Sequence, residues 1–429
     1  MLEIVDGRGQ ETPVHIARPR APRRATSAEE AVRQIVDSVR LRGDAAVVEH
    51  ALRLDGVRLR PDELRVDPDA VVKARALVRP ELVDALEVMA ERVRATSERQ
   101  LPQPWIDRRP DELVGELVRP LRRVGVYAPG GRAAYPSTVI MAAIPARVAG
   151  VGTIAVATPP RPDGSVPESV LAACAVAGID EVYRVGGAQA IAALAYGTEH
   201  VRPVEKVVGP GNQFVTLAKR LVAGWVGTDA DAGPAEVAIV AGEGASPDVL
   251  AADLVAGAEQ GPLGTHALIT WIPALADAVC AALEHEVLVH PRGDDVESAL
   301  VEGGRAVLVR DMRHALDTAN SFAPEHLQLS FDGARDALPD VRSAGAVFVG
   351  PLTPVAVGDY VGGTNHVLPT GGAARFSSGL GASDFVKRIY VSGLERTALE
   401  RMAPHVEALA EAEGLPGRAR ALRARLGDA

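Results

Sequence analysis

The chain has 429 residues, more than one hydrophobic core usually organises, so we expect at least two domains. Hydrophobic residues make up 47% and charged residues 24%, which are ordinary values for a globular protein. The net charge of −10, without a long basic run, argues against nucleic acid as a partner. Two cysteines, Cys174 and Cys280, are too few for a disulfide framework or a cysteine-based metal cluster, and we expect buried thiols in a reduced, cytoplasmic setting. We expect neither a signal peptide nor a membrane span, because the longest apolar stretch, 139–154, contains proline, arginine and glycine.

The first hundred residues are expected to form an arm followed by helices. Residues 1–23 are rich in proline and arginine and have no period, which is typical of an extended arm. Ser27 and Glu30 have the spacing of a capping box, so a helix is predicted to begin there. Residues 62–100 have apolar side chains at helical spacing.

From Val124 onward, short β-rich runs alternate with helical stretches. The first series contains VGVYAPGG, VGTIAVATPP, DEVYRVGG and EKVVGPGN, and the second contains AEVAIVAG, THALITW, RAVLVRD and GAVFVG. This alternation predicts βαβ units and parallel sheets, whose ligands bind outside the carboxyl ends of the strands. Several runs of the first series end in glycines: Gly130–Gly131, Gly186–Gly187 and 209–211. The final stretch, 382–429, is predicted to be helical and charged.

Three polar blocks stand out from the alanine- and valine-rich background. They are VGGAQAIAA with Gln189, FAPEHLQL with Glu325 and His326, and GDYVGGTNHVLPT with Asp359 and His366. An adjacent Glu–His pair offers two bases, since histidine can take the proton of an alcohol and glutamate can activate water. The same pair is also compatible with a helix end that has no function. No G-x-G-x-x-G follows a predicted strand, so these motifs alone give little support for NAD.

Together these blocks resemble the histidinol dehydrogenase family. The motifs PGGRAAYPSTVIMAAIPARVAGV, VYRVGGAQAIAALAYGT, KVVGPGNQFV, DAGPAE, FAPEHLQL and GDYVGGTNHVLPT occur in the family's order, from about residue 27 to the end. The resemblance implies an α/β fold with two incomplete Rossmann-like domains that have parallel-sheet cores, an N-terminal arm, and a helical C-terminal extension. It implies the following division of the chain: an arm (1–23), a discontinuous first domain (24–128 and 240–381), a second domain (129–239), and a dimerisation tail (382–429).

The resemblance also implies a chemistry, the oxidation of an amino alcohol to an amino acid in two NAD-dependent steps. The family's NAD contacts fall on Tyr127, Gln189 and Asn212. Its general bases fall on Glu325 and His326. The histidine is expected to take the alcohol proton as hydride leaves, and the glutamate to activate the water that adds to the aldehyde.

The family's zinc site, in contrast, is largely missing. The ligand positions that a glutamine, a histidine, an aspartate and a second histidine occupy in the family hold Gly257, Gln260, Asp359 and Arg418 here. Asp359 is the only ligand retained, and a protein zinc site needs about three donors, so we do not expect zinc. His266, six residues after Gln260, is a weak candidate for a replacement ligand, because its pattern places it in the next strand.

Other changes affect the substrate side of the resemblance. His366 and Glu413 match substrate-side positions, and Glu413 would reach the site of the neighbouring subunit. Arg418 cannot bind a metal, so we expect it to supply positive charge, either by pairing with Asp359 or by holding a substrate carboxylate or phosphate. The alternative is that Arg418 faces solvent. Two polar family residues are replaced by apolar ones: Ala235 and Val355.

These observations predict an NAD-dependent dehydrogenase acting on CH–OH donors. Because the pocket has lost polar groups, the predicted substrate is a small polar alcohol other than histidinol, oxidised without zinc. One alternative is a genuine histidinol dehydrogenase, converting L-histidinol to L-histidine with two NAD, that has an atypical metal site. The other is a non-catalytic paralogue that binds NAD or a metabolite. In each case we expect a homodimer whose C-terminal tail completes the neighbour's site, with neither nucleic acid nor membrane as a partner.

Overall fold

The structure is a computed structural model that describes residues 1–19, 25–130, 134–231 and 233–427. It divides into two compact units. The main unit comprises Met1–Gln100 and Arg122–Phe385, and the tail unit comprises Leu101–Leu121 and Val386–Ala429. Among the described residues, no helix is both long and apolar enough to cross a bilayer.

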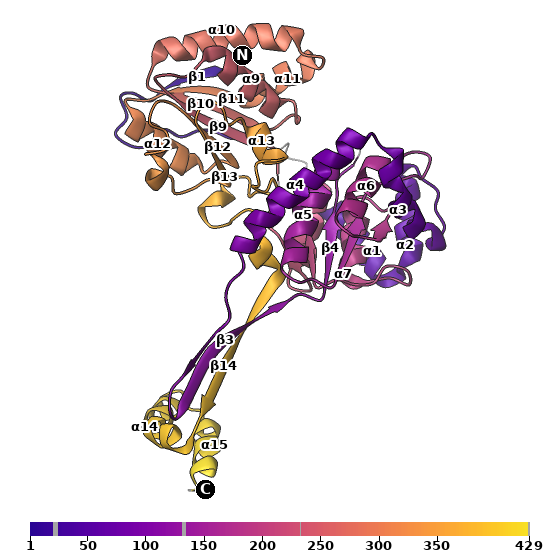
Figure 1. Cartoon of the computed structure of the whole chain (residues 1–429), viewed down its shortest axis with the longest axis vertical. Helices are drawn as coiled ribbons and strands as arrows, with labels where there is room; N and C mark the ends of the chain where they lie inside the picture. Colours follow the sequence, from indigo (N-terminus) through magenta and orange to yellow (C-terminus); the bar gives the residue numbers. More distant parts are fainter. Residues whose placement is uncertain (20–24, 131–133, 232, 428–429) are drawn as a thin grey trace. The chain divides into compact units, whose positions relative to one another are not determined.

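One sheet of the main unit has, among the described residues, six parallel strands in the order β1-β11-β10-β9-β12-β13. Its strands are β1 (Glu3–Asp6), β9 (Glu236–Ala241), β10 (Thr265–Thr270), β11 (Gly304–Leu308), β12 (His326–Ser330) and β13 (Ala346–Val349). One face is covered by α9 (Pro247–Ala258), α10 (Pro273–Val289) and α11 (Gly293–Gly303), and the other by α12 (Met312–Phe322) (Figure 1). The central strands are almost entirely buried, as expected for a parallel sheet covered on both faces.

The second sheet of the main unit has, in its described part, five parallel strands in the order β6-β5-β4-β7-β8. Its strands are β4 (Arg123–Tyr127), β5 (Thr153–Ala157), β6 (Glu181–Tyr183), β7 (Lys206–Val208) and β8 (Gly227–Thr228). Its helices are α1 (Ala25–Arg42), α2 (Asp44–His50), α3 (Pro68–Leu77), α4 (Pro80–Arg99), α5 (Pro136–Val148), α6 (Glu168–Val176), α7 (Gly187–Tyr196) and α8 (Gln213–Val222). The predicted α/β fold with two parallel-sheet cores is confirmed.

The structure assigns the N-terminal segments differently from the predicted boundaries. Residues 24–128 were predicted to belong with the six-stranded sheet, but α1 packs against α7 and α8, and α3 and α4 pack against α6 and α5. The reason is the apolar stripe of α1, formed by Val32, Ile35 and Val39, which is buried in the core of the five-stranded sheet. Helix α1 begins at Ala25, two residues before the predicted N-cap position Ser27. The arm contributes β1, which pairs with β11 at the edge of the six-stranded sheet.

The tail unit contains an antiparallel sheet in the order β14-β3-β2, with two helices. Its elements are β2 (Trp105–Arg108), β3 (Glu112–Pro120), β14 (Val386–Leu394), α14 (Arg396–Ala412) and α15 (Pro416–Leu426) (Figure 1). The prediction that 382–429 is helical was wrong for residues 386–394, which form β14 and pair along their whole length with β3. The run Ile389-Tyr390-Val391 explains the difference, since β-branched and aromatic side chains favour strands.

Short helical turns complete the described chain. They are η1 (Ala51–Asp55), η2 (Pro61–Glu63), η3 (Leu338–Asp340), α13 (Val355–Asp359), η4 (Ala373–Arg375) and η5 (Ala382–Phe385).

The five-stranded sheet reverses its strand order at β4. The chain runs outward through β5 and β6 on one side of β4 and then returns to place β7 and β8 on the other side. Such a switch point opens a ligand crevice at the carboxyl ends of the strands. Gly130 follows β4, Gly186–Gly187 follows β6, and 209–211 follows β7, so these glycines lie at that edge, while Gly131 lies outside the described residues.

Candidate active site

Tyr127 and Gln189 lie close together at the carboxyl edge of the five-stranded sheet. Tyr127 ends β4 and is buried, and its hydroxyl oxygen accepts a hydrogen bond of 3.1 Å from the backbone N–H of Gly187. Burial raises the pKa of Tyr127 to about 12, which keeps the phenol neutral. Gln189, on the first turn of α7, donates to the Asp55 carboxylate at 3.2 Å. Burial raises the pKa of Asp55. Two of the three predicted NAD contacts, Tyr127 and Gln189, therefore lie in one polar cluster at the start of α7.

The third predicted NAD contact, Asn212, belongs to a loop that is fixed on both sides. Its side-chain oxygen caps α8 by accepting from two backbone N–H groups of the first turn. In the same loop, Gly209 has a φ of +115°, and a Cβ there would lie 2.1 Å from the carbonyl oxygen of Tyr127, so only glycine fits. The N–H of Gly209 donates to Asp229 at 2.8 Å, and its carbonyl accepts from Lys219 at 3.2 Å. Lys219 and Asp229 also form a buried ion pair, which holds the loop beside Tyr127.

Glu325 and His326 lie at the amino edge of the six-stranded sheet. Helix α12 ends at Phe322, Ala323 adopts a left-handed conformation with a φ of 51°, and His326 is the first residue of β12. The pair therefore opens a strand and does not end a helix. This position also differs from the carboxyl-edge location that is usual for open α/β sheets.

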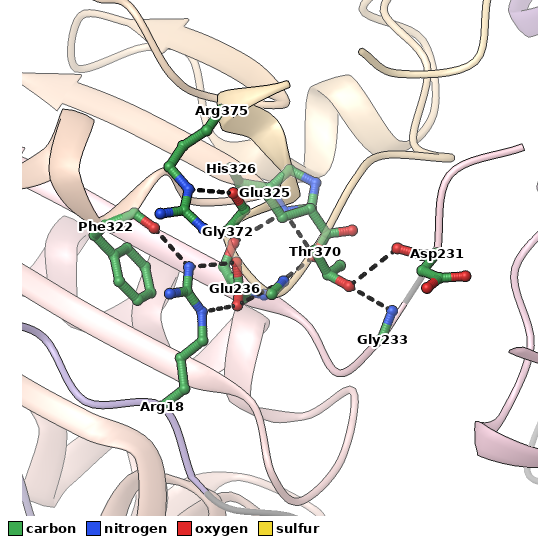
Figure 2. A network of polar contacts seen from close by, with 11 residues as sticks. Arg18, Asp231, Gly233, Glu236, Phe322, Glu325, His326, Thr370, Gly372 and Arg375 are labelled. Carbon is green, nitrogen blue, oxygen red and sulfur yellow. Dashed lines mark hydrogen bonds and ion pairs between the residues drawn. The ribbon is translucent and has the colours of Figure 1, made fainter. Parts of the chain in front are cut away.

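The main chain of Glu236, the first residue of the neighbouring strand β9, holds both bases (Figure 2). Its N–H donates to the Glu325 carboxylate at 3.1 Å, and its carbonyl oxygen lies 3.3 Å from Nδ1 of His326. Because a carbonyl oxygen can only accept, Nδ1 of His326 carries a proton and Nε2 presents a lone pair. Nε2 lies 3.5 Å from the Asp359 carboxylate. The geometry thus leaves Nε2 as the basic atom of His326.

The surroundings of the pair raise both pKa values above their ordinary values. Burial raises the pKa of Glu325 to about 7, although its neighbour His326 opposes the shift. Burial also lowers the pKa of His326, but the carboxylates of Glu325 and Asp359 outweigh it and raise that pKa above its ordinary value. Groups that exchange protons near pH 7 are suited to general acid–base catalysis.

His366, from the third polar block, has both ring nitrogens engaged. Its Nδ1 lies 2.9 Å from the carbonyl oxygen of Asp359, and its Nε2 lies 3.2 Å from the hydroxyl of Thr138 on α5. Burial lowers the pKa of His366, so the ring is neutral. The neighbouring Asn365 donates to the carbonyl of Met141 at 2.7 Å. His366 therefore connects α13 with α5.

The residues present do not fit the family's zinc. A Cβ on Gly257 would lie 2.9 Å from Cγ2 of Val237 and 3.1 Å from Nδ1 of His266, so α9 packs too closely for a glutamine at that position. Gln260 is exposed beyond the end of α9. Within the described part of the chain, no group of three or more His, Cys, Asp or Glu side chains could hold a metal ion.

His266 occupies the space beside Gly257. It lies on β10 and is fully buried, and neither of its ring nitrogens has a hydrogen-bond partner within the described part of the chain. Burial lowers its pKa to about 4, so the ring is neutral.

Four other predicted positions are Glu413, Arg418, Ala235 and Val355. Glu413 and Arg418 belong to the tail unit, where they are exposed and pair with each other at 3.0 Å. Pairing of Arg418 with Asp359 remains a prediction. Ala235 is half-buried directly before β9, and Val355 is buried at the start of α13.

Sequence reasoning missed three residues of the site. Glu236 holds the base pair, Arg18 binds Glu236, and Asp55 accepts from Gln189. The sequence carried a signal only for Glu236, which ends the DAGPAE motif.

The fold and the buried base pair define an NAD-dependent oxidoreductase that acts on CH–OH donors. The family model described as histidinol dehydrogenase matches residues 18–426. Histidinol dehydrogenase 2 of a Nostoc species is 45% identical over 93% of this chain and 92% of its own length, and a histidinol dehydrogenase of a Synechococcus species is 46% identical over 92% of each. The crystal structure of the Elizabethkingia anophelis histidinol dehydrogenase has a TM-score of 0.91 at 30% identity and covers 99% of this chain and 98% of its own. The chain belongs to the histidinol dehydrogenase family.

These comparisons correct the predicted substrate. A small polar alcohol other than histidinol was predicted because polar family residues are replaced at Ala235 and Val355. Relatives that are about 45% identical over more than nine-tenths of the chain are named histidinol dehydrogenases, which contradicts that prediction and favours its alternative. Similarity along the whole chain therefore outweighs the local replacements in the pocket.

Proposed function

We propose that this protein oxidises L-histidinol to L-histidine with two molecules of NAD and one of water. The observation that carries the proposal is the buried pair of Glu325 and His326, both held by the main chain of Glu236. The relatives named histidinol dehydrogenases support the choice of substrate. NAD, when bound, accepts the hydride in each of the two oxidations.

In the first oxidation, Nε2 of His326 takes the hydroxyl proton while hydride leaves the same carbon, which gives the aldehyde. The tautomer fixed by the carbonyl of Glu236 supports this role, because it leaves Nε2 with a lone pair. In the second oxidation, ionised Glu325 removes a proton from water as the oxygen adds to the aldehyde, and protonated His326 returns its proton to the carbonyl oxygen, which gives the hydrate. The hydrate then loses a hydride from carbon to NAD and a proton from oxygen to His326, which gives the acid.

NAD is proposed to bind at the switch point of the five-stranded sheet. Tyr127 and Gln189 lie on one polar cluster there, and Asn212 lies on the loop that Gly209 brings against Tyr127. The positive end of α7, which begins at Gly187, favours the pyrophosphate charge. None of these steps uses zinc, because Gly257 and Gln260 do not provide the family's ligands.

We further propose a homodimer in which the tail unit completes the neighbour's site. Glu413 and Arg418 are exposed on the tail unit. Exposed apolar side chains on the same unit, such as Trp105 and Tyr390, support an interface there. Mixing His326→Ala with Glu413→Ala protein should restore activity if one site combines residues from both chains. Failure to restore it in mixed dimers would contradict this arrangement.

The proposed reaction is tested by incubating the protein, purified without a chelator, with L-histidinol and NAD, before and after dialysis against a chelator. We expect NADH to form, L-histidine to appear as the product, and zinc to be substoichiometric in the active protein. Absence of NADH would overturn the proposed substrate. Stoichiometric zinc whose removal abolishes turnover would overturn the metal-free mechanism.

A further inference from the structure

We propose that Arg18, in the N-terminal arm, is a positioning residue for the base pair Glu325–His326. It acts through the side chain of Glu236 and through the carbonyl group of Phe322 at the end of α12. The inference rests on the proposed function for its kinetic readout, but the contacts themselves are independent of the substrate.

The first contact of Arg18 is with a buried carboxylate. Its Nε donates to one oxygen of Glu236 at 2.5 Å, and its Nη2 donates to the other at 3.2 Å (Figure 2). The Glu236 side chain is only 4% exposed, whereas that of Arg18 is 30% exposed. The N–H of Gly371 donates to the same carboxylate at 3.1 Å. A planar guanidinium that binds both oxygens fixes the direction of the carboxylate as well as its charge.

The main chain of Glu236, whose position depends on these side-chain contacts, binds both bases. Its N–H holds the Glu325 carboxylate, and its carbonyl sets the tautomer of His326. Since Glu236 is the first residue of β9, its backbone lies at the end of a hydrogen-bonded ladder. The side-chain contacts with Arg18 and Gly371 hold this end where the ladder stops.

The second contact of Arg18 fixes the turn that leads into the base pair. Nη2 of Arg18 donates to the carbonyl of Phe322 at 2.6 Å, and the guanidinium carbon lies 4.0 Å from the centre of the Phe322 ring. The next residue, Ala323, is in the left-handed region, which an alanine adopts only when its surroundings hold it. Glu325 follows two residues later. One arginine thus holds both the turn that leads into the base pair and the neighbouring strand whose main chain binds the pair.

Contacts other than those of Arg18 anchor the arm, so the role of Arg18 can be tested without detaching the arm. Strand β1 pairs with β11, and Val14 and Ile16 are buried in the core that also contains residues of α12. Arg8, in the same arm, pairs with Asp6 on the surface and provides a matched control. Substitution of Arg18 should therefore disturb the base pair while the arm stays bound.

The kinetic test compares Arg18→Ala with Arg8→Ala. We expect Arg18→Ala to lower kcat by about tenfold or more, because small misplacements of catalytic groups have effects of that size. The KM for NAD should not change, since its proposed site lies on the other sheet. Guanidinium at a non-denaturing concentration should restore part of the lost kcat, and sodium chloride at the same concentration should not. Glu236→Gln should lower kcat less in the Arg18→Ala variant than in the unmodified protein, because the two residues act as one unit.

A second measurement needs no substrate. Hydrogen exchange of the backbone amides between 322 and 328 should become faster in Arg18→Ala than in Arg8→Ala, with exchange in β1 unchanged. Equal exchange and equal kcat in the two variants would overturn the proposal. A loss of kcat that is fully explained by a lower melting temperature of Arg18→Ala would also overturn it. If the unmodified protein makes no NADH from L-histidinol, the proposed function fails and the exchange measurement alone decides the role of Arg18.

Discussion

Replacing Glu325 by glutamine should stabilise the protein, and the gain should grow with pH. Burial raises the pKa of Glu325 from its ordinary value of 4.5 to about 7, so the folded chain binds this proton more tightly than the unfolded chain does. The stability that this group contributes is therefore complete below pH 4.5 and is lost as the pH rises to about 7. At about 1.4 kcal/mol per pKa unit, the ionised carboxylate costs roughly 3 kcal/mol above pH 7.

Glutamine removes this cost without changing the size of the side chain, and its oxygen can still accept from the N–H of Glu236. The free energy of unfolding, measured in urea at pH 5 and pH 8, should be raised at pH 8 by about 3 kcal/mol and much less at pH 5. Glu284→Gln, at an exposed glutamate of α10, is the control and should show no such dependence. A gain from Glu325→Gln that is equal at both pH values, or a loss at pH 8, would refute the reasoning.

The remaining predictions concern the bases, the NAD loop and the close contact at α9. His326→Ala should abolish alcohol oxidation, whereas Glu325→Gln should keep it and accumulate aldehyde, as followed by NADH formation and aldehyde trapping; equal loss at the first step would contradict the two roles. Lys219→Met leaves the Asp229 carboxylate buried without its cation and should cost about 3–5 kcal/mol of unfolding free energy while raising the KM for NAD. Gly257→Ala should lower the unfolding free energy by about 1–2 kcal/mol through overpacking against Val237 and His266. An unchanged urea midpoint would contradict this, because it would show that these side chains move aside without cost.

The sequence was sufficient to predict the two parallel sheets because their strands carry a strong local signal. The runs 237–241 and 267–269 are apolar throughout, and the strands that contain them alternate with helices, which is the pattern of βαβ units. Strands β1 and β14 were missed, since β1 is a short exposed edge strand and β14 was judged by its charge. Its partner β3 lies more than 250 residues earlier in the chain, and pairing over such a separation has no local pattern.

In the site, too, features of adjacent residues could be predicted from the sequence, whereas contacts between residues far apart in the chain could not. Glu325 and His326 could be singled out because adjacent bases in an apolar background are a local feature. The contact between Arg18 and Glu236 could not, because it joins residues separated by 218 positions. The packing at Gly257 depends on His266 and Val237 from two other elements, so its effect on the metal site required the structure.

The stoichiometry of NADH formation tests the central claim most directly. With L-histidinol limiting and NAD in excess, the account predicts two NADH and one L-histidine for each L-histidinol consumed by the purified protein. One NADH for each L-histidinol, with the aldehyde as the final product, would contradict the assignment of Glu325 as the base for water. No NADH at all would contradict the proposed reaction itself.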